Sequence, residues 1–208
     1  MSYIDVNRAI NNYGMNITGV IHVGGHYGEE YSTYKSIPTI SNIVFFEPDE
    51  SSFIKLKETT AHDSCVTCFK TGLGPFSGNA KFYRSLDCEG QANSTLQPLI
   101  VKDIYPSIKF TEISTIEIET LDSYNFPTDY NLLNMDVQGG ELNVLLGATD
   151  TLKRIQYILT EVNTAELYKN CALIEDLDYF LGKHGFKRIE TGLESETQTW
   201  GDALYIKV

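Results

Sequence analysis

Short apolar segments that alternate with helical patterns constrain the fold of this chain more than any other feature. Residues 19–23 and 42–47 are nearly continuous apolar runs, which is typical of strands buried on both faces in a parallel sheet. Each run is followed by a predicted helix, at about residues 28–36 and from Pro48 through DESSFIKLKET. Alternation of this kind predicts a doubly wound α/β sheet with helices on both faces.

The same alternation continues along the 208-residue chain. Further strands are expected at residues 65–73, 130–137 and 156–163. Two more helices are expected, one beginning near Gly140 and one at about residues 173–185. Ligands of such sheets bind beyond the carboxyl ends of the strands, near the point where the strand order reverses.

The two ends and the middle of the chain depart from this rhythm. Residues 4–13 predict an amphipathic helix, and the segments 186–190 and 202–208 are expected to pair as a C-terminal antiparallel hairpin. Residues 74–125 combine turns, a loop and a strand with period-two alternation. We therefore expect one domain over residues 1–208, with 74–125 as an insertion that contributes to substrate binding.

The composition favours a globular protein with a ligand that is not strongly anionic. Hydrophobic residues make up 42% of the chain, and 28 acidic against 16 basic residues give a net charge of −12. Lysine and arginine are scattered, so a nucleic-acid partner is disfavoured. No apolar run approaches the roughly 20 residues of a membrane span, and the N-terminus lacks a signal-peptide layout. We expect a cytoplasmic protein, and the oligomeric state stays open.

Four cysteines allow two interpretations. His62, Cys65, Cys68 and Cys88 could form a zinc set. Cys65 and Cys68, however, fall in a predicted strand, where their spacing points them to opposite faces. Buried, reduced thiols are therefore favoured for these residues and for Cys171, in agreement with a cytosolic location.

Polar and glycine residues follow three successive predicted strands. Gly24, Gly25 and Gly28 follow the first strand, Glu47 follows the second, and residues 71–73 end the third. Glycines allow a ligand to approach the backbone closely, and we expect their N–H groups to donate to it. An acid at the end of the second strand can accept hydrogen bonds from both ribose hydroxyls. The combination predicts an adenosine-containing cofactor.

The spacing of the glycines distinguishes between two such cofactors. A dinucleotide loop requires G-x-G-x-x-G with a pyrophosphate at the following helix N-terminus. Here the pattern is Gly24-x-His26-x-Gly28, and Glu29 and Glu30 open the helix. Two carboxylates would oppose a pyrophosphate but tolerate a cationic sulfonium. The loop therefore favours S-adenosylmethionine over NAD, with a turn that binds no ligand as the remaining alternative.

A resemblance becomes specific at the end of the fourth strand. The motifs IHVGGHYGEE, VFFEPDESSFIKLK, TLDSY and LLNMDVQGGELNVLLGA, in that order, resemble the FkbM-type methyltransferases over about residues 17–165. The resemblance implies a Rossmann-like class I methyltransferase fold with S-adenosylmethionine as the cofactor. It also implies methyl transfer to a hydroxyl oxygen, often of a sugar or a polyketide-type natural product.

The cofactor loop of that family usually reads D-V-G-A-N-x-G. Gly24, Gly25 and Gly28 match its glycine, alanine and glycine positions, whereas His22 replaces the aspartate and His26 the asparagine. The family's F-E-P motif is also present and assigns the ribose to its glutamate. The resemblance and the strand ends together imply these cofactor-binding residues: Gly24, Gly25, His26, Tyr27, Gly28, Glu47, Pro48, Gly72, Leu73 and Asp136.

The segment after the fourth strand carries the family's second set of polar residues. Asp136 and Glu141 match the acids of its D-V-E-G-x-E segment, and Gln138 replaces the first glutamate. Asn134 stands where many members have a lysine. These departures leave the catalytic base open.

Methyl transfer to a hydroxyl needs in-line alignment and a group that removes the hydroxyl proton. Asp136 ends the fourth strand, and Glu161 and Asn163 end the fifth, so all three are expected around one crevice. Their oxygens suit a hard cation such as Mg²⁺, as in metal-dependent catechol-type methyltransferases, which the arrangement resembles. A metal-free alternative uses Asp136 or His22 as the base. The catalytic candidates are thus Asp136, His22 and Glu161, and the metal candidates Asp136, Glu161 and Asn163.

The substrate-binding candidates are Ser94, Gln138 and Glu141, of which Ser94 lies in a stretch that resembles the family's serine-rich segment. Trp200 and Tyr205 could form an aromatic platform for a sugar ring or pack in the core. The predicted function is S-adenosylmethionine-dependent O-methylation of a hydroxyl on a sugar or glycoconjugate. The alternatives are an RNA ribose or small natural product as the acceptor, and a non-catalytic nucleoside-binding module.

Overall fold

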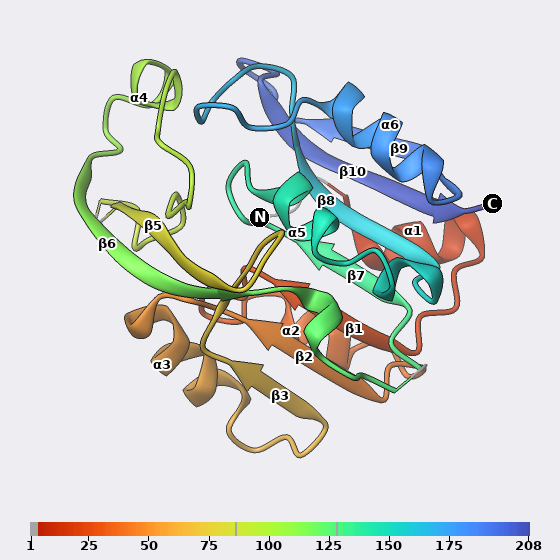
Figure 1. The fold of residues 1–208 in the computed structure, drawn as a ribbon. Helices are drawn as coiled ribbons and strands as arrows, with labels where there is room; N and C mark the ends of the chain where they lie inside the picture. Colours follow the sequence, from red (N-terminus) through yellow and green to blue (C-terminus); the bar gives the residue numbers. More distant parts are fainter. Residues whose placement is uncertain (1–3, 86, 128) are drawn as a thin grey trace.

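The computed structural model describes residues 4–85, 87–127 and 129–208, and its largest element is a seven-stranded sheet (Figure 1). The strand order is β3-β2-β1-β7-β8-β10-β9. The bounds of these strands are β1 Gly19–Val23, β2 Asn42–Phe46, β3 Val66–Phe69, β7 Leu132–Met135, β8 Tyr157–Asn163, β9 Phe186–Leu193 and β10 Trp200–Lys207. The first five in spatial order are parallel, and β10 runs antiparallel to β8 and β9. This confirms the predicted mostly parallel sheet with a C-terminal antiparallel hairpin.

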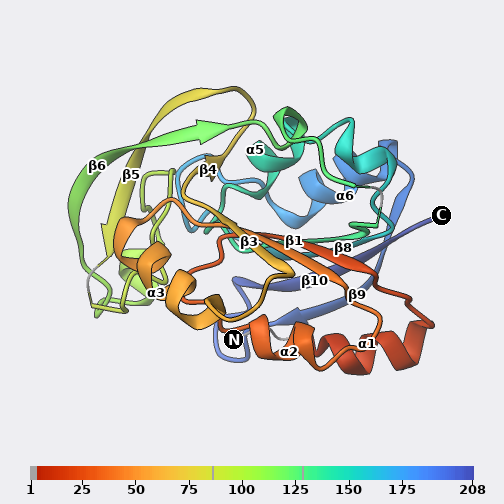
Figure 2. The ribbon, with the colours of Figure 1, turned by 90° about the horizontal axis from the view of Figure 1, so that it is seen from below.

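Helices cover both faces of this sheet. The helices are α1 Val6–Tyr13, α2 Tyr31–Lys35, α3 Glu50–Thr60, α4 Val101–Ile104, α5 Glu141–Leu146 and α6 Ile174–Lys183, with short 3-10 helices at Leu121–Ser123 and Thr151–Lys153. Figure 2 shows α1, α2 and α3 on one side of the sheet and α5 and α6 on the other. The strand order reverses between β1 and β7, which lie side by side in the sheet.

The strands divide the core into two apolar clusters because their side chains alternate between the two faces. Val20 and Phe45 pack on the side of α1, α2 and α3. Ile21 and Phe46 pack on the side of α5 and α6. All five residues of β1 are buried, as the nearly continuous apolar run predicted.

The predicted third strand at residues 65–73 is wrong as a single element. Its first part is β3, but β4 (Gly72–Leu73) belongs to a second sheet of order β4-β6-β5. A Cβ atom on Gly72 would lie 3.0 Å from the Ile116 side chain, so glycine permits the close contact with β6. The chain therefore leaves the main sheet after Phe69 and joins the second, three-stranded sheet.

Two strands of the second sheet lie in the segment predicted to be an insertion. The sheet pairs β5 (Gly78–Ser85) antiparallel with β6 (Phe110–Glu119), and Figure 1 shows both beside the main sheet. The loop between them contains α4. This arrangement places the loop residues near the carboxyl ends of the main strands.

Two helix starts differ from the sequence-based boundaries. α3 begins at Glu50 rather than at Pro48, because the Asp49 side chain caps it by accepting the Ser52 N–H at 3.0 Å. α2 is confined to Tyr31–Lys35, since the preceding residues form a turn closed by the Gly28 N–H, which donates to the Gly25 carbonyl at 2.8 Å.

The cysteines are free thiols, and one was placed wrongly. Cys171 is buried and Cys68 and Cys88 are half-buried, but Cys65 is exposed. Cys65 lies just before β3: its backbone N–H donates to Asp63, and its carbonyl accepts the Ile43 N–H of β2 at 3.0 Å, which leaves its side chain exposed at the end of the strand. In the described part of the chain, no helix combines the length and apolarity that a membrane crossing requires.

Candidate active site

A cavity of about 910 Å³ opens at the carboxyl ends of β1, β2, β7 and β8. Its walls come from the turns that follow these strands, from the residues before α1, and from the loop at residues 88–95. It therefore lies at the reversal of the strand order, where the sequence analysis expected the ligand. Seven of the ten predicted cofactor residues line it: Gly24, His26, Glu47, Pro48, Gly72, Leu73 and Asp136.

The glycine turn after β1 is shaped mainly by packing within the protein. Gly24 has a φ of +88°, and a Cβ atom there would lie 1.8 Å from the Asp136 carbonyl oxygen. The N–H groups of Gly24 and Gly25 both donate to the Phe46 carbonyl. These two N–H groups are therefore engaged with β2, whereas the sequence analysis expected them to face a ligand.

The other two glycine-loop residues outside the cavity wall pack against α3. Cβ atoms on Gly25 and Gly28 would lie 3.2 Å and 3.0 Å from Leu56. The Lys55 ammonium nitrogen lies over the Tyr27 ring, 3.9 Å from the ring centroid. These residues hold the turn against the helix that follows β2.

Glu47 is the acid that follows β2, and its side chain is only 6% exposed. Its Oε2 accepts the His26 N–H at 2.9 Å and its Oε1 accepts the Asp49 N–H at 2.7 Å. Burial raises its pKa to about 7, although these two hydrogen bonds favour the ionised form. Each oxygen keeps a second lone pair for a ligand hydroxyl in the cavity.

His26 connects the β1 turn to the loop that crosses the cavity. Its Nδ1 lies 2.7 Å from Glu29 Oε1 and its Nε2 lies 3.0 Å from the Glu89 carbonyl oxygen. Because both partners only accept, the ring donates from both nitrogens as an imidazolium. Burial opposes this charge, but the two acceptors raise the pKa of His26 overall. Tyr27 stacks on the ring and donates its hydroxyl to the same carbonyl.

Gln138 is the centre of a hydrogen-bond network after β7. Its Nε2 donates to Asp136 Oδ1 at 2.7 Å and to Glu161 Oε2 at 2.6 Å, and its Oε1 accepts the Tyr168 hydroxyl at 3.0 Å. Its backbone carbonyl accepts the Ser94 hydroxyl at 2.7 Å. Gln138 and Ser94 line the cavity, but their polar groups are largely committed to this network.

The two carboxyl groups that Gln138 joins differ in environment. Asp136 is exposed to the cavity, whereas Glu161 is 3% exposed. Burial and then the charges of Asp136 and Glu141 raise the pKa of Glu161 well above its ordinary value. Glu161 thus holds a proton more readily than a solvent-exposed glutamate does.

Glu141 lies beneath the turn and outside the cavity wall. Its Oε1 accepts the N–H groups of Val137 and Gly139 at 3.1 Å and 3.2 Å, and it is 1% exposed. Burial raises its pKa to about 7. Glu141 therefore stabilises the turn that presents Asp136, and it is not positioned to contact a substrate as predicted.

His22 lines the cavity and is 2% exposed. The Tyr34 hydroxyl accepts from Asn134 Nδ2 at 2.6 Å and lies 2.9 Å from His22 Nδ1. With Asn134 donating to it, the hydroxyl has its own proton left for His22, which makes Nδ1 the acceptor. The neutral ring then carries its proton on Nε2.

The three predicted metal ligands are not brought together. Asp136 and Glu161 share the Gln138 amide, but Asn163 is fully buried and does not line the cavity. Neither atom of its amide has a hydrogen-bond partner among the described residues. The described residues also contain no group of three or more His, Cys, Asp or Glu side chains arranged to hold a metal ion. The set therefore does not fit the Mg²⁺ site that the sequence suggested.

The loop side of the cavity carries an aromatic and apolar wall. Trp200 donates its indole N–H to the Tyr105 hydroxyl at 2.8 Å, and both residues line the cavity. Tyr205, the other aromatic candidate, is 1% exposed in the core and donates to Asp178. Sequence reasoning missed Tyr105, Tyr168, Tyr34 and the Glu89 carbonyl, because their roles depend on contacts between distant segments.

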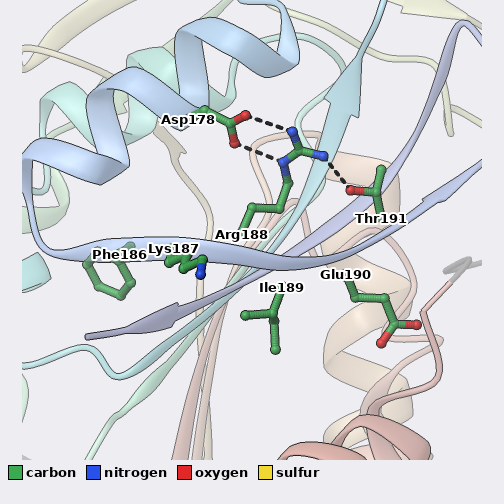
Figure 3. A pocket seen from close by; sticks show the side chains of 7 residues that line it. All are labelled: Asp178, Phe186, Lys187, Arg188, Ile189, Glu190 and Thr191. Atoms are coloured by element: carbon green, nitrogen blue, oxygen red, sulfur yellow. Dashed lines mark hydrogen bonds and ion pairs between the residues drawn. The ribbon is translucent and has the colours of Figure 1, made fainter.

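A second, more open hollow of about 520 Å³ lies along the edge strand β9. Figure 3 shows Arg188 of this strand directed toward α6, where its guanidinium donates to both Asp178 oxygens and to Thr191. Glu190 lies on the other side of the strand and pairs with Arg8 of α1. These contacts tie helices to the edge strand, and none of the predicted site residues lies here.

The fold and the cavity together define a class of protein. A parallel sheet with a central reversal, a glycine turn after its first strand and a buried acid after its second define a Rossmann-like nucleoside-binding protein. The family model described as the methyltransferase FkbM domain matches residues 22–188, and the chain belongs to this family. The family and the fold are those of S-adenosylmethionine-dependent methyltransferases.

Three proteins illustrate the similarity. The chain is 24% identical over 159 residues to the 2-O-methyltransferase NoeI of Sinorhizobium fredii, and the match covers 72% of this chain and 65% of that protein. It resembles the fold of magnesium protoporphyrin IX methyltransferase from Synechocystis, solved with bound S-adenosylmethionine (TM-score 0.55, 10% identity, 98% of this chain and 76% of that one). A putative tRNA (m1A22) methyltransferase of Streptococcus pneumoniae is similar (TM-score 0.53, 11% identity, 99% and 73%).

Proposed function

We propose that the protein is an S-adenosylmethionine-dependent O-methyltransferase that acts on a hydroxyl group of a sugar or glycoconjugate. The main support is the charge of the cavity: carboxyl side chains recur in its walls, and none of its described lining residues is Lys or Arg. Such walls suit a nucleoside that carries a cationic sulfonium, and they oppose the pyrophosphate of NAD. Family membership supports methyl transfer, and the similarity to a 2-O-methyltransferase supports oxygen as the acceptor atom.

The cofactor would lie across the turns after β1, β2 and β7. In this proposal Glu47 accepts the ribose hydroxyls, since it lines the cavity and each of its oxygens accepts only one N–H within the protein. Gly72 and Leu73 form the adjacent wall, and Asp136 lies near the reacting end. The Gly24 turn would hold these groups in register through its contact with the Asp136 backbone.

The reaction is an in-line displacement at the methyl carbon. The acceptor oxygen forms the new O–C bond as the C–S bond breaks, and the hydroxyl proton passes to a base. We assign the base to Asp136, which is exposed to the cavity, and its orientation to Gln138. Glu161, whose pKa is raised, carries a proton of its own, and this limits the negative charge around Asp136.

The remaining catalytic candidates have smaller parts in this proposal. His22 has Nδ1 engaged by Tyr34 and a proton on Nε2, so in this state it can donate a hydrogen bond but cannot take the acceptor proton. A divalent cation is not included, because Asn163 stands outside the cavity wall. No step is routed through a metal.

Methyl transfer with purified protein tests the proposal. S-adenosylhomocysteine should appear when S-adenosylmethionine and a sugar acceptor are both present, and Asp136→Ala should abolish it. Asp103→Ala, a change to an exposed acid outside the cavity, is the control. Binding of S-adenosylmethionine without product for any hydroxyl acceptor would favour the non-catalytic module. An Asp136→Ala variant with full activity would refute the assignment of the base.

A further inference from the structure

The cavity is larger than the cofactor region described above, and its walls as a whole carry an unusual charge. Besides Glu47, six carboxyl side chains line it: Asp5, Glu29, Glu30, Asp136, Glu161 and Asp202. They come from segments as distant as the start of α1, the turn before α2, and β8 and β10. No described lining residue is Lys or Arg. His26, which donates from both ring nitrogens, carries a positive charge in this wall.

Cations close to this region in the fold are bound to partners elsewhere. Arg84 of β5, the strand that also supplies the lining residue Phe82, pairs with Asp49 at 2.8 Å. Lys70, just before the lining residue Thr71, pairs with Glu50. An anionic group entering the cavity would therefore meet carboxylates without a compensating guanidinium or ammonium group in the wall.

The part of the wall formed by Trp200, at the start of β10, and Tyr105, after α4, can bind a ring without any charge. Trp200 and Tyr105 are half-buried, are joined by the 2.8 Å hydrogen bond, and belong to an apolar cluster with Val101 and Leu167. The apolar face of a sugar ring packs on aromatic side chains of this kind, while its hydroxyls reach polar groups. This wall and the carboxyl groups face the same cavity.

We propose that the acceptor is an uncharged glycoside that binds against Trp200 and Tyr105, and not a sugar that carries a phosphate or a nucleoside diphosphate. The proposal rests on the function proposed above and names its substrate class. The proposal also gives the order of glycosyl transfer and methylation. A sugar loses its activating nucleoside diphosphate when a glycosyl transferase attaches it to an acceptor. Glycosyl transfer must therefore supply the substrate, and methylation follows it.

Matched acceptors test the charge requirement. Methyl glycosides of common hexoses and deoxyhexoses are compared with the same sugars as 1-phosphates and as nucleoside diphosphate sugars, at low ionic strength. For any sugar that is methylated, kcat/KM should fall at least tenfold in the phosphorylated forms, and added salt should narrow the difference. Equal or faster transfer to a phosphorylated form would overturn the proposal while the methyltransferase function stands. Methylation of other hydroxyl compounds but of no sugar would overturn both.

Two pairs of variants locate the effect in the cavity. Glu30→Lys should reduce the discrimination against the phosphorylated sugar, whereas Glu58→Lys, an equal charge change on the exposed face of α3, should not. An equal effect of both variants would mean that the net charge of the whole molecule is responsible, which would contradict the proposal.

Trp200→Leu should raise the KM for the glycoside severalfold, and Trp200→Phe should restore it. An unchanged KM in Trp200→Leu would refute the aromatic subsite.

Discussion

At the scale of single residues, the replacement of a family glutamate by Gln138 changes the chemistry of the crevice. An amide can donate to two carboxyl groups at once, and Gln138 does so to Asp136 and Glu161. A glutamate here would remove both donated hydrogen bonds and add a third acid. Gln138 therefore holds the two carboxyl groups together in one hydrogen-bond network without adding a negative charge.

Gln138→Glu should lower kcat at neutral pH and move the acidic limb of the pH–rate profile to higher pH. The added negative charge raises the pKa of the neighbouring carboxyl groups, so the base is protonated over a wider range. Gln91→Glu is the matched control, since Gln91 also lines the cavity but lies on the loop. A pH profile identical to that of the unchanged protein would contradict the role given to Gln138.

Cofactor affinity should depend on the ionisation of Glu47. Its pKa of about 7 means that the carboxylate, which accepts both ribose hydroxyls, forms only as the pH rises through this value. We expect S-adenosylhomocysteine to bind several times more tightly at pH 8 than at pH 6 by calorimetry. Glu47→Gln should weaken binding and remove the pH dependence, and Glu50→Gln, a change to an exposed acid, should do neither.

At the scale of elements, the turns after β1 and β7 form one packed unit. Gly24 has no room for a side chain beside the Asp136 carbonyl, and Glu141 closes the second turn from below. The position of Asp136 thus depends on two turns that are more than 100 residues apart in the sequence.

Gly24→Ala should destabilise the protein by at least about 2 kcal/mol, because it combines a left-handed backbone with a steric clash. Gly182→Ala is the matched control. Gly182 lies in α6 with no atom within 4 Å of an added Cβ, so the change should stabilise by about 0.5–1 kcal/mol. Denaturant unfolding measures both, and similar effects of the two variants would refute the packing argument.

The link between the β1 turn and the loop at residues 88–93 should weaken as the pH rises. The pKa of His26 is raised in the folded protein. The stabilisation that its charged ring gives is therefore complete below the unfolded-state pKa near 6.5, and it is lost as the pH rises through the folded-state pKa. The facing groups are Glu29, Glu47 and the Glu89 carbonyl. Hydrogen exchange of residues 88–93, corrected for intrinsic rates, should speed up at high pH. His26→Leu should remove this pH dependence.

At the scale of the whole molecule, the buried acids and the net charge of −12 both make the folded state less stable as the pH rises. The folded pKa values of Glu47 and Glu141 are about 7, above the ordinary value of 4.5, so the folded state binds more protons between these limits. Stability should therefore rise as the pH falls from 8 toward 5, by on the order of 1–3 kcal/mol. The thermal midpoint measures this, and Glu141→Gln should flatten the dependence. A midpoint that falls over this range would contradict it.

The sequence predicted the larger part of the fold, because burial on two faces leaves a direct apolar signature. β1 and β2 were found from nearly continuous apolar runs, and the final hairpin was recognised. The break at residues 70–71 was missed, since the exit of Gly72 to another sheet depends on contact with Ile116. Local pattern could not reveal that contact.

The sequence alone determined the order of elements, the glycine turn, the acid after β2 and the family, because these depend on local pattern and spacing. Tertiary structure decided what the polar residues do. It moved Glu141 under the turn and Asn163 out of the cavity wall, and it joined Asp136, Gln138 and Glu161 in one network. The physical reason is that a side chain's hydrogen bonds and desolvation depend on neighbours from distant segments, which spacing along the chain does not specify.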